Sequence, residues 1–194
     1  MKIVLASKSP RRKEILEGLG VNFEIVTADT PEISNAETPE GYVEDISREK
    51  GAAVLEMLKD KNALVISADT VVVLGQKILG KPRDKADAVN TLKMLSGKTH
   101  SVITAVTLNY GGKVYTAHEV TDVKFGEISD VDIRRYVDTG EPMDKAGAYA
   151  VQGIASLWID GINGCYFNVV GFPTRLFFKM LGESGINTSE VLRF

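Results

Sequence analysis

The longest apolar run of the chain, residues 63–74 (ALVISADTVVVL), places the strongest constraint on the fold. Its β-branched side chains favour a strand that is buried on both faces of a sheet. One polar interruption, residues 67–70, places Asp69 between apolar neighbours. An unpaired carboxylate is costly to bury, so we expect Asp69 to meet a cation, a metal ion or several hydrogen-bond donors.

The segment before this run alternates between strand and helix patterns. Residues 3–6 are expected to form a strand, residues 10–18 a helix, and residues 23–27 a second strand. A longer helix is expected to begin after Thr38, which has the side chain of an N-cap, and to continue to about Lys59. Such alternation is typical of α/β proteins.

A β-hairpin is expected in the middle of the chain. Two β-prone runs, residues 101–110 and 113–125, are joined by Gly111 and Gly112, which supply the positive φ angles of a tight turn. The other expected elements are a short strand at residues 77–79 and helices at 84–96, 129–137 and 173–181. The pattern predicts an α/β fold with an elongated mixed sheet, flanking helices and an insertion that forms a second lobe. Residues 1–194 contain no linker-like stretch, so we predict a single domain of two lobes.

Composition excludes several classes of function. The formal net charge is −3, from 23 basic and 26 acidic residues, whereas a protein that binds long nucleic acids normally has a basic excess. No apolar run approaches the roughly 18 residues that a membrane span needs. One cysteine and two histidines are too few for a cysteine- or histidine-rich metal site. A metal ion would therefore be held by carboxylates, which favours Mg²⁺ or Mn²⁺.

The segment between the first strand and the first helix has the residue types of an anion-binding turn. Ser7 and Ser9 precede Pro10, and Arg11 and Arg12 stand in the first helical turn, where the helix dipole would favour carboxylates. Backbone N–H groups, hydroxyls and guanidinium groups together can bind phosphate. The alternative is a surface helix whose arginines point into water.

Several other charged residues are candidates for the same site. Asp69 has two interpretations, a structural carboxylate bonded to turn amides, or a metal ligand or base that activates water. Either Glu32 or Asp29, both in a polar loop, is a candidate for a second carboxylate. Lys81 and Lys145 lie in glycine-containing segments and could neutralise a polyphosphate, although single lysines of this kind are more often surface residues.

These residues belong to an ordered series of blocks that resembles the Maf family of nucleotide pyrophosphatases, also described as septum-formation-inhibitor-like proteins. The resemblance covers nearly the whole chain. Besides Glu32, the blocks are residues 7–12 (SKSPRR), 48–50 (REK), 67–70 (SADT), 80–83 (GKPR), 140–149 (GEPMDKAGAY), 152–153 (QG) and 169–173 (VVGFP).

The resemblance implies a fold and an activity. The implied fold is similar to that of inosine-triphosphate pyrophosphatases, with two lobes around a central nucleotide cleft. The implied reaction hydrolyses a nucleoside triphosphate to the monophosphate and pyrophosphate with a divalent metal cation, Mg²⁺ or Mn²⁺. Within the family, the chain is most similar to the branch that acts on dTTP and UTP, and modified pyrimidine nucleotides are further candidate substrates.

The resemblance also implies roles for individual residues. Asp69 is similar to the catalytic proton acceptor, and Asp69 with Glu32 would hold the metal. The residues implied for substrate specificity are Arg11, Thr70 and Gln152. The residues implied for phosphate binding are Ser7, Ser9, Arg12, Lys50, Lys81 and Lys145, although helical spacing alone favours a solvated position for Lys50.

Two alternative functions remain open at this stage. One is a house-cleaning pyrophosphatase for non-standard purine nucleotides such as dITP or XTP. The other is a regulator of cell division that binds nucleotides without hydrolysing them. For each of these functions we expect a cytoplasmic protein that has no membrane partner and binds no long nucleic acid. The resemblance makes a homodimer one candidate assembly, because members of the family are often dimeric, and the oligomeric state stays open.

Overall fold

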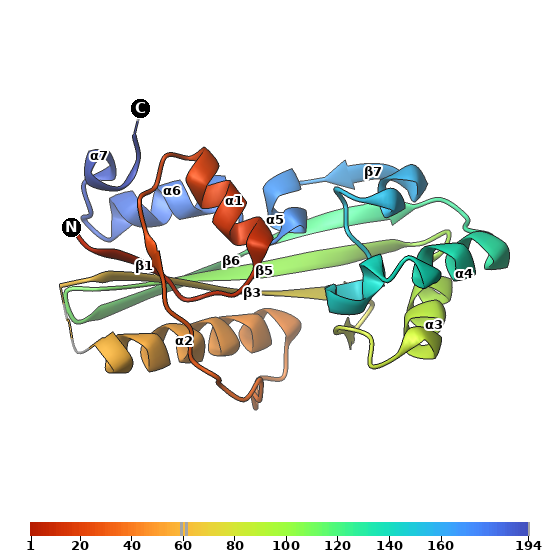
Figure 1. Cartoon of the computed structure of the whole chain (residues 1–194), viewed down its shortest axis with the longest axis horizontal. Coiled ribbons are helices and arrows are strands. Elements are labelled where there is room, and N and C mark those ends of the chain that lie inside the picture. The colour runs from red at the N-terminus through yellow and green to blue at the C-terminus, as the bar shows by residue number, and fades with distance from the viewer. Residues whose placement is uncertain (59, 61, 194) are drawn as a thin grey trace. The chain divides into compact units, whose positions relative to one another are not determined.

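The computed structural model describes residues 1–58, 60 and 62–193 as strands, helices and their connections (Figure 1). The strands are β1 (Ile3–Leu5), β2 (Glu24–Ile25), β3 (Leu64–Leu74), β4 (Lys77–Leu79), β5 (Thr99–Tyr110), β6 (Lys113–Phe125) and β7 (Ile159–Asn163). The α-helices are α1 (Pro10–Gly18), α2 (Pro39–Leu58), α3 (Lys85–Leu95), α4 (Asp130–Asp138), α5 (Tyr166–Val170), α6 (Thr174–Glu183) and α7 (Thr188–Val191). Short 3₁₀ helices are η1 (Glu141–Asp144), η2 (Ala146–Ala148) and η3 (Ile154–Trp158).

Most of the predicted elements are present, with changes at their ends. Helix α1 has the predicted bounds, and α2 begins after Thr38, whose Oγ1 accepts a hydrogen bond from Gly41 N at 3.1 Å. The predicted end of that helix near Lys59 lies outside the described residues. Strand β2 is shorter than predicted, whereas β3 continues without a break through residues 67–70. The predictions missed β7, α5 and α7, which are all short.

The strands form one mixed sheet of seven strands, in the order β2-β1-β3-β5-β6-β7, with β4 paired to β3. Strand β1 is parallel to both β2 and β3, while β4 is antiparallel to β3 and β7 is antiparallel to β6. Gly111 and Gly112 have φ angles of 58° and 75°, so the hairpin between β5 and β6 uses the left-handed conformations that glycine allows. The predicted mixed α/β sheet with flanking helices is confirmed.

The chain divides into two compact units. Unit 1 contains Met1–Asp69, Thr104–Glu119 and Gly171–Phe194, and unit 2 contains Thr70–Ile103 and Val120–Val170. Strands β3, β5 and β6 contribute residues to both units. The single domain and the cleft between lobes stay predictions.

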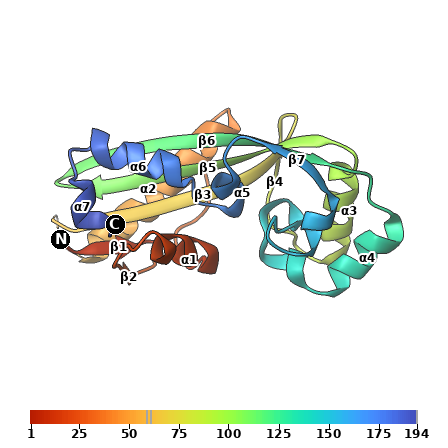
Figure 2. The ribbon, with the colours of Figure 1, turned by 90° about the horizontal axis from the view of Figure 1, so that it is seen from above.

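Unit 1 has its core where α2 packs on the first strands. The buried side chains of Val4, Ala6 and Val65 meet Val54 of α2. Helix α2 lies along one face of these strands and α6 along the opposite face (Figures 1 and 2). The sheet of unit 1 is therefore covered on both faces, as the apolar run in β3 requires.

Unit 2 has its core between α3, α4 and an aromatic cluster. Helices α3 and α4 lie side by side and bury Leu92 and Ile133 (Figure 2). The rings of His100, Phe125 and Tyr149 meet edge to face, with centroids 4.8 to 5.4 Å apart. Such edge-to-face pairs fix the packing of aromatic rings more tightly than apolar burial alone.

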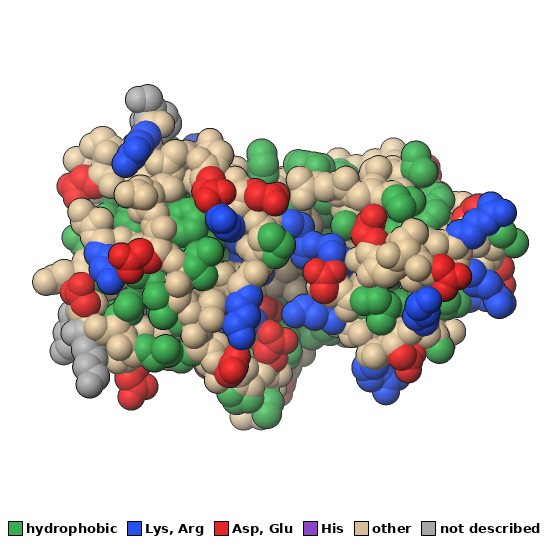
Figure 3. Space-filling view, in the orientation of Figure 1, with side chains coloured by type: hydrophobic (Ala, Val, Ile, Leu, Met, Phe, Trp, Pro, Cys, Tyr) green, Lys and Arg blue, Asp and Glu red, His purple; other side chains and the backbone are tan. Residues whose placement is uncertain are grey.

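Charges of both signs are interspersed on the face shown in Figure 3. On the face of the molecule in Figure 3, basic and acidic side chains lie close to one another, in agreement with the small net charge of −3. Among the described residues, no helix combines the length and the apolar composition that a membrane span requires.

Gly51 of α2 lies where a larger residue would clash. A Cβ atom at this position would come within 2.6 Å of Ser67 Oγ and would also meet Asn109 Nδ2. We expect Gly51→Ala to lower the free energy of unfolding by about 1–3 kcal/mol, although alanine favours the helix. Urea denaturation measures the change.

Gly182→Ala is the matched control, because Gly182 also lies in a helix, α6, and has no atom within 4 Å of its Cβ position. We expect this variant to gain about 0.5–1 kcal/mol from helix propensity. Equal changes in the two variants would show that close packing at Gly51 is unimportant.

His100 gives the stability of the protein a dependence on pH. Burial lowers the pKa of His100 to about 4, while the charge of Asp122 has a smaller, opposite effect. The unfolded chain, with a histidine pKa of about 6.5, binds a proton first as the pH falls. The stability that neutral His100 contributes to the folded protein is therefore fully present above pH 6.5. It falls by up to about 3 kcal/mol as the pH declines towards 4.

We expect His100→Gln to flatten this part of the curve of unfolding free energy against pH, since it removes the titrating group. Urea titrations of both proteins at intervals from pH 7.5 to pH 4 measure the effect. Parallel curves for the two proteins would contradict the assignment to His100.

Candidate active site

The turn between β1 and α1 is organised by Ser7 and Arg12. Ser7 Oγ accepts hydrogen bonds from Ser9 N at 3.2 Å and from Arg12 Nη1 at 3.1 Å. Ser9 is the N-cap residue of α1, and its side chain makes no capping hydrogen bond. Pro10 follows at the first helical position, where its lack of an N–H group costs nothing. The predicted strand, hydroxyl turn and helix are therefore all present.

Arg12 connects this turn to two distant segments. Its Nη1 donates to the backbone oxygen of Ala68 at 2.8 Å, and its Nε donates to the backbone oxygen of Gly171 at 3.0 Å. Burial lowers the pKa of Arg12, the charge of Asp69 opposes this shift, and the charge of Arg11 adds to it. Arg12 does not point freely into water, because it fixes the backbone directly before Asp69.

Asp69 and Glu32 share one cation. Lys50 Nζ lies 2.7 Å from Asp69 Oδ1 and 2.7 Å from Glu32 Oε1. The exposed fractions of the side chains are 12% for Asp69, 20% for Lys50 and 51% for Glu32. The expectation that Asp69 meets a cation is confirmed, and the solvated position expected for Lys50 from its spacing is wrong.

The polar loop that holds Glu32 is tied to α2 by Tyr42. Tyr42 Oη donates to the backbone oxygen of Glu32 at 3.2 Å. Burial raises the pKa of Tyr42, and the charges of Asp69 and Glu32 raise it further. Asp29, the other candidate for a second carboxylate, pairs instead with Lys8 at 2.9 Å. Glu32 is thus the loop carboxylate that lies beside Asp69.

The carboxylate pair fits a hard divalent cation. The described residues contain no group of three or more histidine, cysteine or acidic side chains that could hold a metal ion by themselves. Mg²⁺, however, is commonly bound by one or two carboxylates together with substrate phosphates and waters. Since Asp69 and Glu32 already converge on the Lys50 ammonium, their oxygens can reach one cation.

Apart from Arg11, which lies in α1 of unit 1 next to Arg12, the remaining predicted site residues belong to unit 2. Lys81 is exposed and follows Gly80, whose backbone oxygen accepts a hydrogen bond from Gly147 N at 3.1 Å. Lys145 Nζ donates to the backbone oxygen of Glu141 at 3.3 Å and pairs with Asp144. The backbone bond between Gly80 and Gly147 therefore links the two segments that carry Lys81 and Lys145.

Position 147, which donates the backbone hydrogen bond to Gly80, requires a glycine. Its φ angle is 67°, and a Cβ atom there would lie 2.7 Å from Val72 Cγ2. Thr70 is half-buried at the point where β3 enters unit 2, and Gln152 is exposed in a turn before η3.

Two contributors to the site were missed by sequence reasoning. Tyr42 falls inside the helix predicted after Thr38, and Gly171 inside the block of residues 169–173, but neither is predicted to contact the site. Both act on residues more than nine positions away, through a hydroxyl group and a backbone oxygen. Helical spacing and turn signals contain no information on such contacts.

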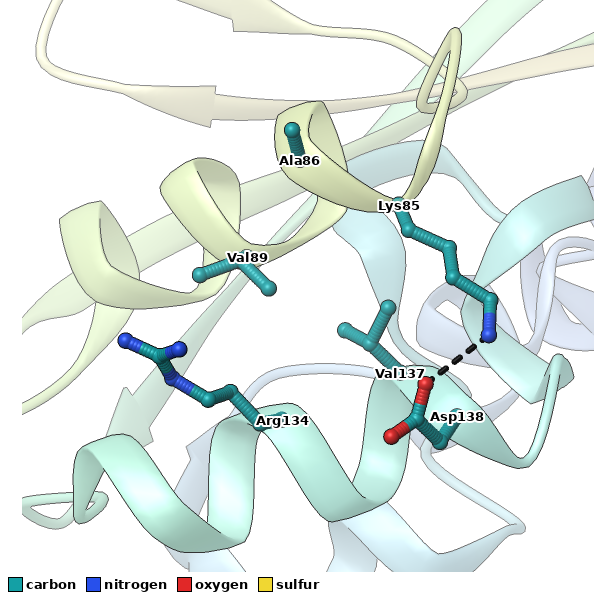
Figure 4. Close-up of a pocket in the computed structure, with 6 residues that line it drawn as sticks. All are labelled: Lys85, Ala86, Val89, Arg134, Val137 and Asp138. Atoms are coloured by element: carbon teal, nitrogen blue, oxygen red, sulfur yellow. Dashed lines mark hydrogen bonds and ion pairs between the residues drawn. The ribbon is translucent and has the colours of Figure 1, made fainter.

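A pocket elsewhere in unit 2 contains none of the predicted site residues. It has a volume of about 260 Å³ and lies between α3 and α4 (Figure 4). Lys85 and Asp138 form an ion pair of 2.8 Å at its rim, and Arg134 extends along another side. The lining residues are Lys85, Ala86, Val89, Arg134, Val137 and Asp138.

Comparisons with solved structures find only a weak similarity. A nucleoside-triphosphatase / dITP/XTP pyrophosphatase from Mycobacterium abscessus aligns over 95% of this chain and 97% of its own, at 14% identity and a TM-score of 0.44. The Ham1 protein of Staphylococcus aureus aligns over 64% of this chain and 72% of its own, at 12% identity and a TM-score of 0.45.

Sequence comparisons find relatives that are much more similar to this chain. A protein of Pelotomaculum thermopropionicum named dTTP/UTP pyrophosphatase is 49% identical over 189 residues, which is 96% of this chain and 98% of that protein. Proteins of the same name from Thermoanaerobacter sp. (strain X514) and Aquifex aeolicus are 46% and 44% identical, each over 183 residues. These alignments cover 93% and 94% of this chain and 95% of each relative. The family model described as Maf-like protein matches residues 2–184, which confirms the resemblance in the motifs, and the chain belongs to the Maf family.

Proposed function

We propose that the protein hydrolyses dTTP and UTP to the nucleoside monophosphate and pyrophosphate. The observation that carries the proposal is the cluster of Asp69, Glu32 and Lys50, in which two carboxylates converge on one cation. This cluster lies in the same unit as the Ser7 and Arg12 turn. Relatives that are 44–49% identical bear the name dTTP/UTP pyrophosphatase. Free nucleotides are its substrates, and the cytoplasm is its site of action.

In the proposed mechanism, Asp69 is the base. A water oxygen attacks the α-phosphorus, and its proton passes to the Asp69 carboxylate. The bond between the α-phosphorus and the bridging oxygen breaks, and pyrophosphate leaves with the electron pair. The low exposure of Asp69 keeps bulk water from competing for the carboxylate, and Arg12 holds the backbone next to it.

Asp69 and Glu32 are the residues that would hold Mg²⁺ or Mn²⁺. Such an ion supplies charge for the phosphate oxygens and lowers the pKa of a bound water. Lys50 would move from the carboxylates to phosphate oxygens when nucleotide is bound, because both are anionic partners for one flexible ammonium. The proposed phosphate-binding residues are Ser7, Ser9, Arg12, Lys50, Lys81 and Lys145.

Base selection is assigned to Arg11, Thr70 and Gln152. Gln152 carries a donor and an acceptor on one amide, which suits the edge of a uracil or thymine ring. Its exposure in a turn leaves the amide accessible to a ligand. A site that reads hydrogen bonds in this way discriminates strongly against a base that presents the wrong groups.

A nucleotide panel tests the proposed function. We expect release of pyrophosphate from dTTP and UTP with Mg²⁺ or Mn²⁺, weaker activity with CTP, dITP and XTP, and loss of activity in EDTA that added metal restores. A preference for dITP or XTP would favour the purine alternative. Nucleotide binding without product would favour a regulator that does not catalyse hydrolysis.

Asp69→Asn tests the catalytic assignment. We expect kcat with dTTP to fall by about 10²–10⁴-fold, because the amide cannot accept the proton of the attacking water. Pyrophosphate release measures the rate, and Asp160→Asn, a change at an exposed carboxylate of unit 2, is the control that should leave the rate unchanged. Turnover of Asp69→Asn at the rate of the unmodified protein would exclude Asp69 as the base.

A further inference from the structure

Glu141 lies at the start of η1, directly after a left-handed glycine that ends the preceding helix. Gly140 has a φ angle of 81°, and Glu141 N donates to Thr139 Oγ1 at 3.2 Å. The side chain of Glu141 is only partly exposed, although glutamate is usually a surface residue. The mechanism above assigns it no role.

The carboxylate of Glu141 accepts hydrogen bonds from two neutral donors. Tyr136 Oη donates to Oε1 at 2.9 Å, and Ile154 N lies 3.2 Å from Oε1 and 3.4 Å from Oε2. The chain approaches so closely here that a Cβ atom on Gly153 would lie 2.5 Å from Glu141 Cδ and 2.8 Å from Oε2. The carboxylate is therefore fitted against the backbone of residues 153 and 154.

Tyr136, which donates to the Glu141 carboxylate, also contacts Ala150 at the other end of the segment 150–154. Its Oη accepts a hydrogen bond from Ala150 N at 3.4 Å, and its ring packs edge to face on Trp158 at 5.2 Å. Burial raises the pKa of Tyr136, and the bond to Glu141 raises it further, so the hydroxyl keeps the proton that it donates. Residues 150 and 154 are thus both anchored, directly or through Tyr136, to one carboxylate.

Gln152 lies between the two anchors. A backbone hydrogen bond from Gly153 N to Ala150 O, 3.1 Å long, closes the turn, and the Gln152 side chain is exposed. The backbone oxygen of Glu141 also accepts from Lys145 Nζ at 3.3 Å. One residue therefore contacts both the turn that carries Gln152 and the ammonium of Lys145.

We propose that Glu141 is a positioning residue, whose carboxylate holds the turn of residues 150–154 so that Gln152 can select the base. This inference rests on the proposed function, since it deepens the role given there to Gln152. The part of Glu141 that contacts Lys145 is the backbone oxygen, which a side-chain substitution retains. Loss of the carboxylate should therefore affect base selection more than phosphate binding.

Hydrogen exchange tests the positioning without any assay of activity. We expect the amides of residues 150–154 to exchange about tenfold faster in Glu141→Ala than in the unmodified protein, because Ile154 N loses its acceptor. Glu141→Gln retains an acceptor oxygen and should restore most of the protection. Glu127→Ala, at an exposed carboxylate of the same unit, is the matched control and should leave this segment unchanged.

Nucleotide selectivity tests whether the Glu141 carboxylate supports base selection by Gln152. We expect the ratio of kcat/KM for UTP to that for CTP to fall by roughly tenfold in Glu141→Ala, mainly through KM for UTP, because a displaced amide reads the base poorly. Tyr136→Phe keeps the bond between Glu141 and Ile154, so this ratio should fall less in that variant. Combining Glu141→Ala with Gln152→Ala should reduce the ratio no further than Gln152→Ala alone, since both changes act through one side chain.

The outcomes separate the inference from the proposed function. Unchanged exchange in Glu141→Ala would overturn the positioning role, whatever the substrate is. Faster exchange with an unchanged selectivity ratio, or equal losses for every nucleotide, would overturn the link to Gln152. An unmodified protein that hydrolyses neither UTP nor dTTP would overturn the proposed function, while the exchange measurement would still decide the positioning role.

Discussion

The negative charge of Asp69 on a buried strand is the constraint that organises unit 1. Its side chain is only 12% exposed, and an unpaired carboxylate in such a place would cost several kcal/mol. Two cations offset this cost. Lys50 of α2 forms an ion pair with Asp69, and the charge of Arg12 lies close to Asp69. The positions of α1, α2 and β3 are therefore coupled through one group, and Glu32 joins them through the same lysine.

This coupling explains how β3 runs unbroken through its polar stretch. The apolar run at residues 63–74 predicts one buried strand, but local signals show no partner for the polar side chains at 67–70. In the structure Ser67 Oγ donates to the backbone oxygen of Ser47 at 2.7 Å, and Asp69 pairs with Lys50. With these distant partners the strand continues. The hairpin at Gly111 and Gly112 and helix α1 were predicted well because their signals are local.

The candidate site shows the same division between local and distant information. Residue types and motif order indicated Asp69, Glu32 and Arg12, but only the fold shows that Lys50 joins the two carboxylates and that Arg12 binds two backbone oxygens. The net charge of −3 also gave little guidance, because it averages over cations that are concentrated in short segments. A net charge describes long-range attraction, whereas a nucleotide is bound by a few groups at contact distance.

Glu141 and Glu32 have different hydrogen-bond partners, and these partners indicate different roles for the two carboxylates. Glu141 is bonded to a tyrosine hydroxyl and a backbone N–H, which are neutral groups of the fold of unit 2 and cannot be exchanged for a ligand without breaking the contact that holds the turn. Glu32 is bonded to the ammonium of Lys50, which is flexible and can be replaced by another cation. The first carboxylate is therefore suited to hold a turn in place. The second, together with Asp69, is suited to a site where cations and phosphates are exchanged in every catalytic cycle.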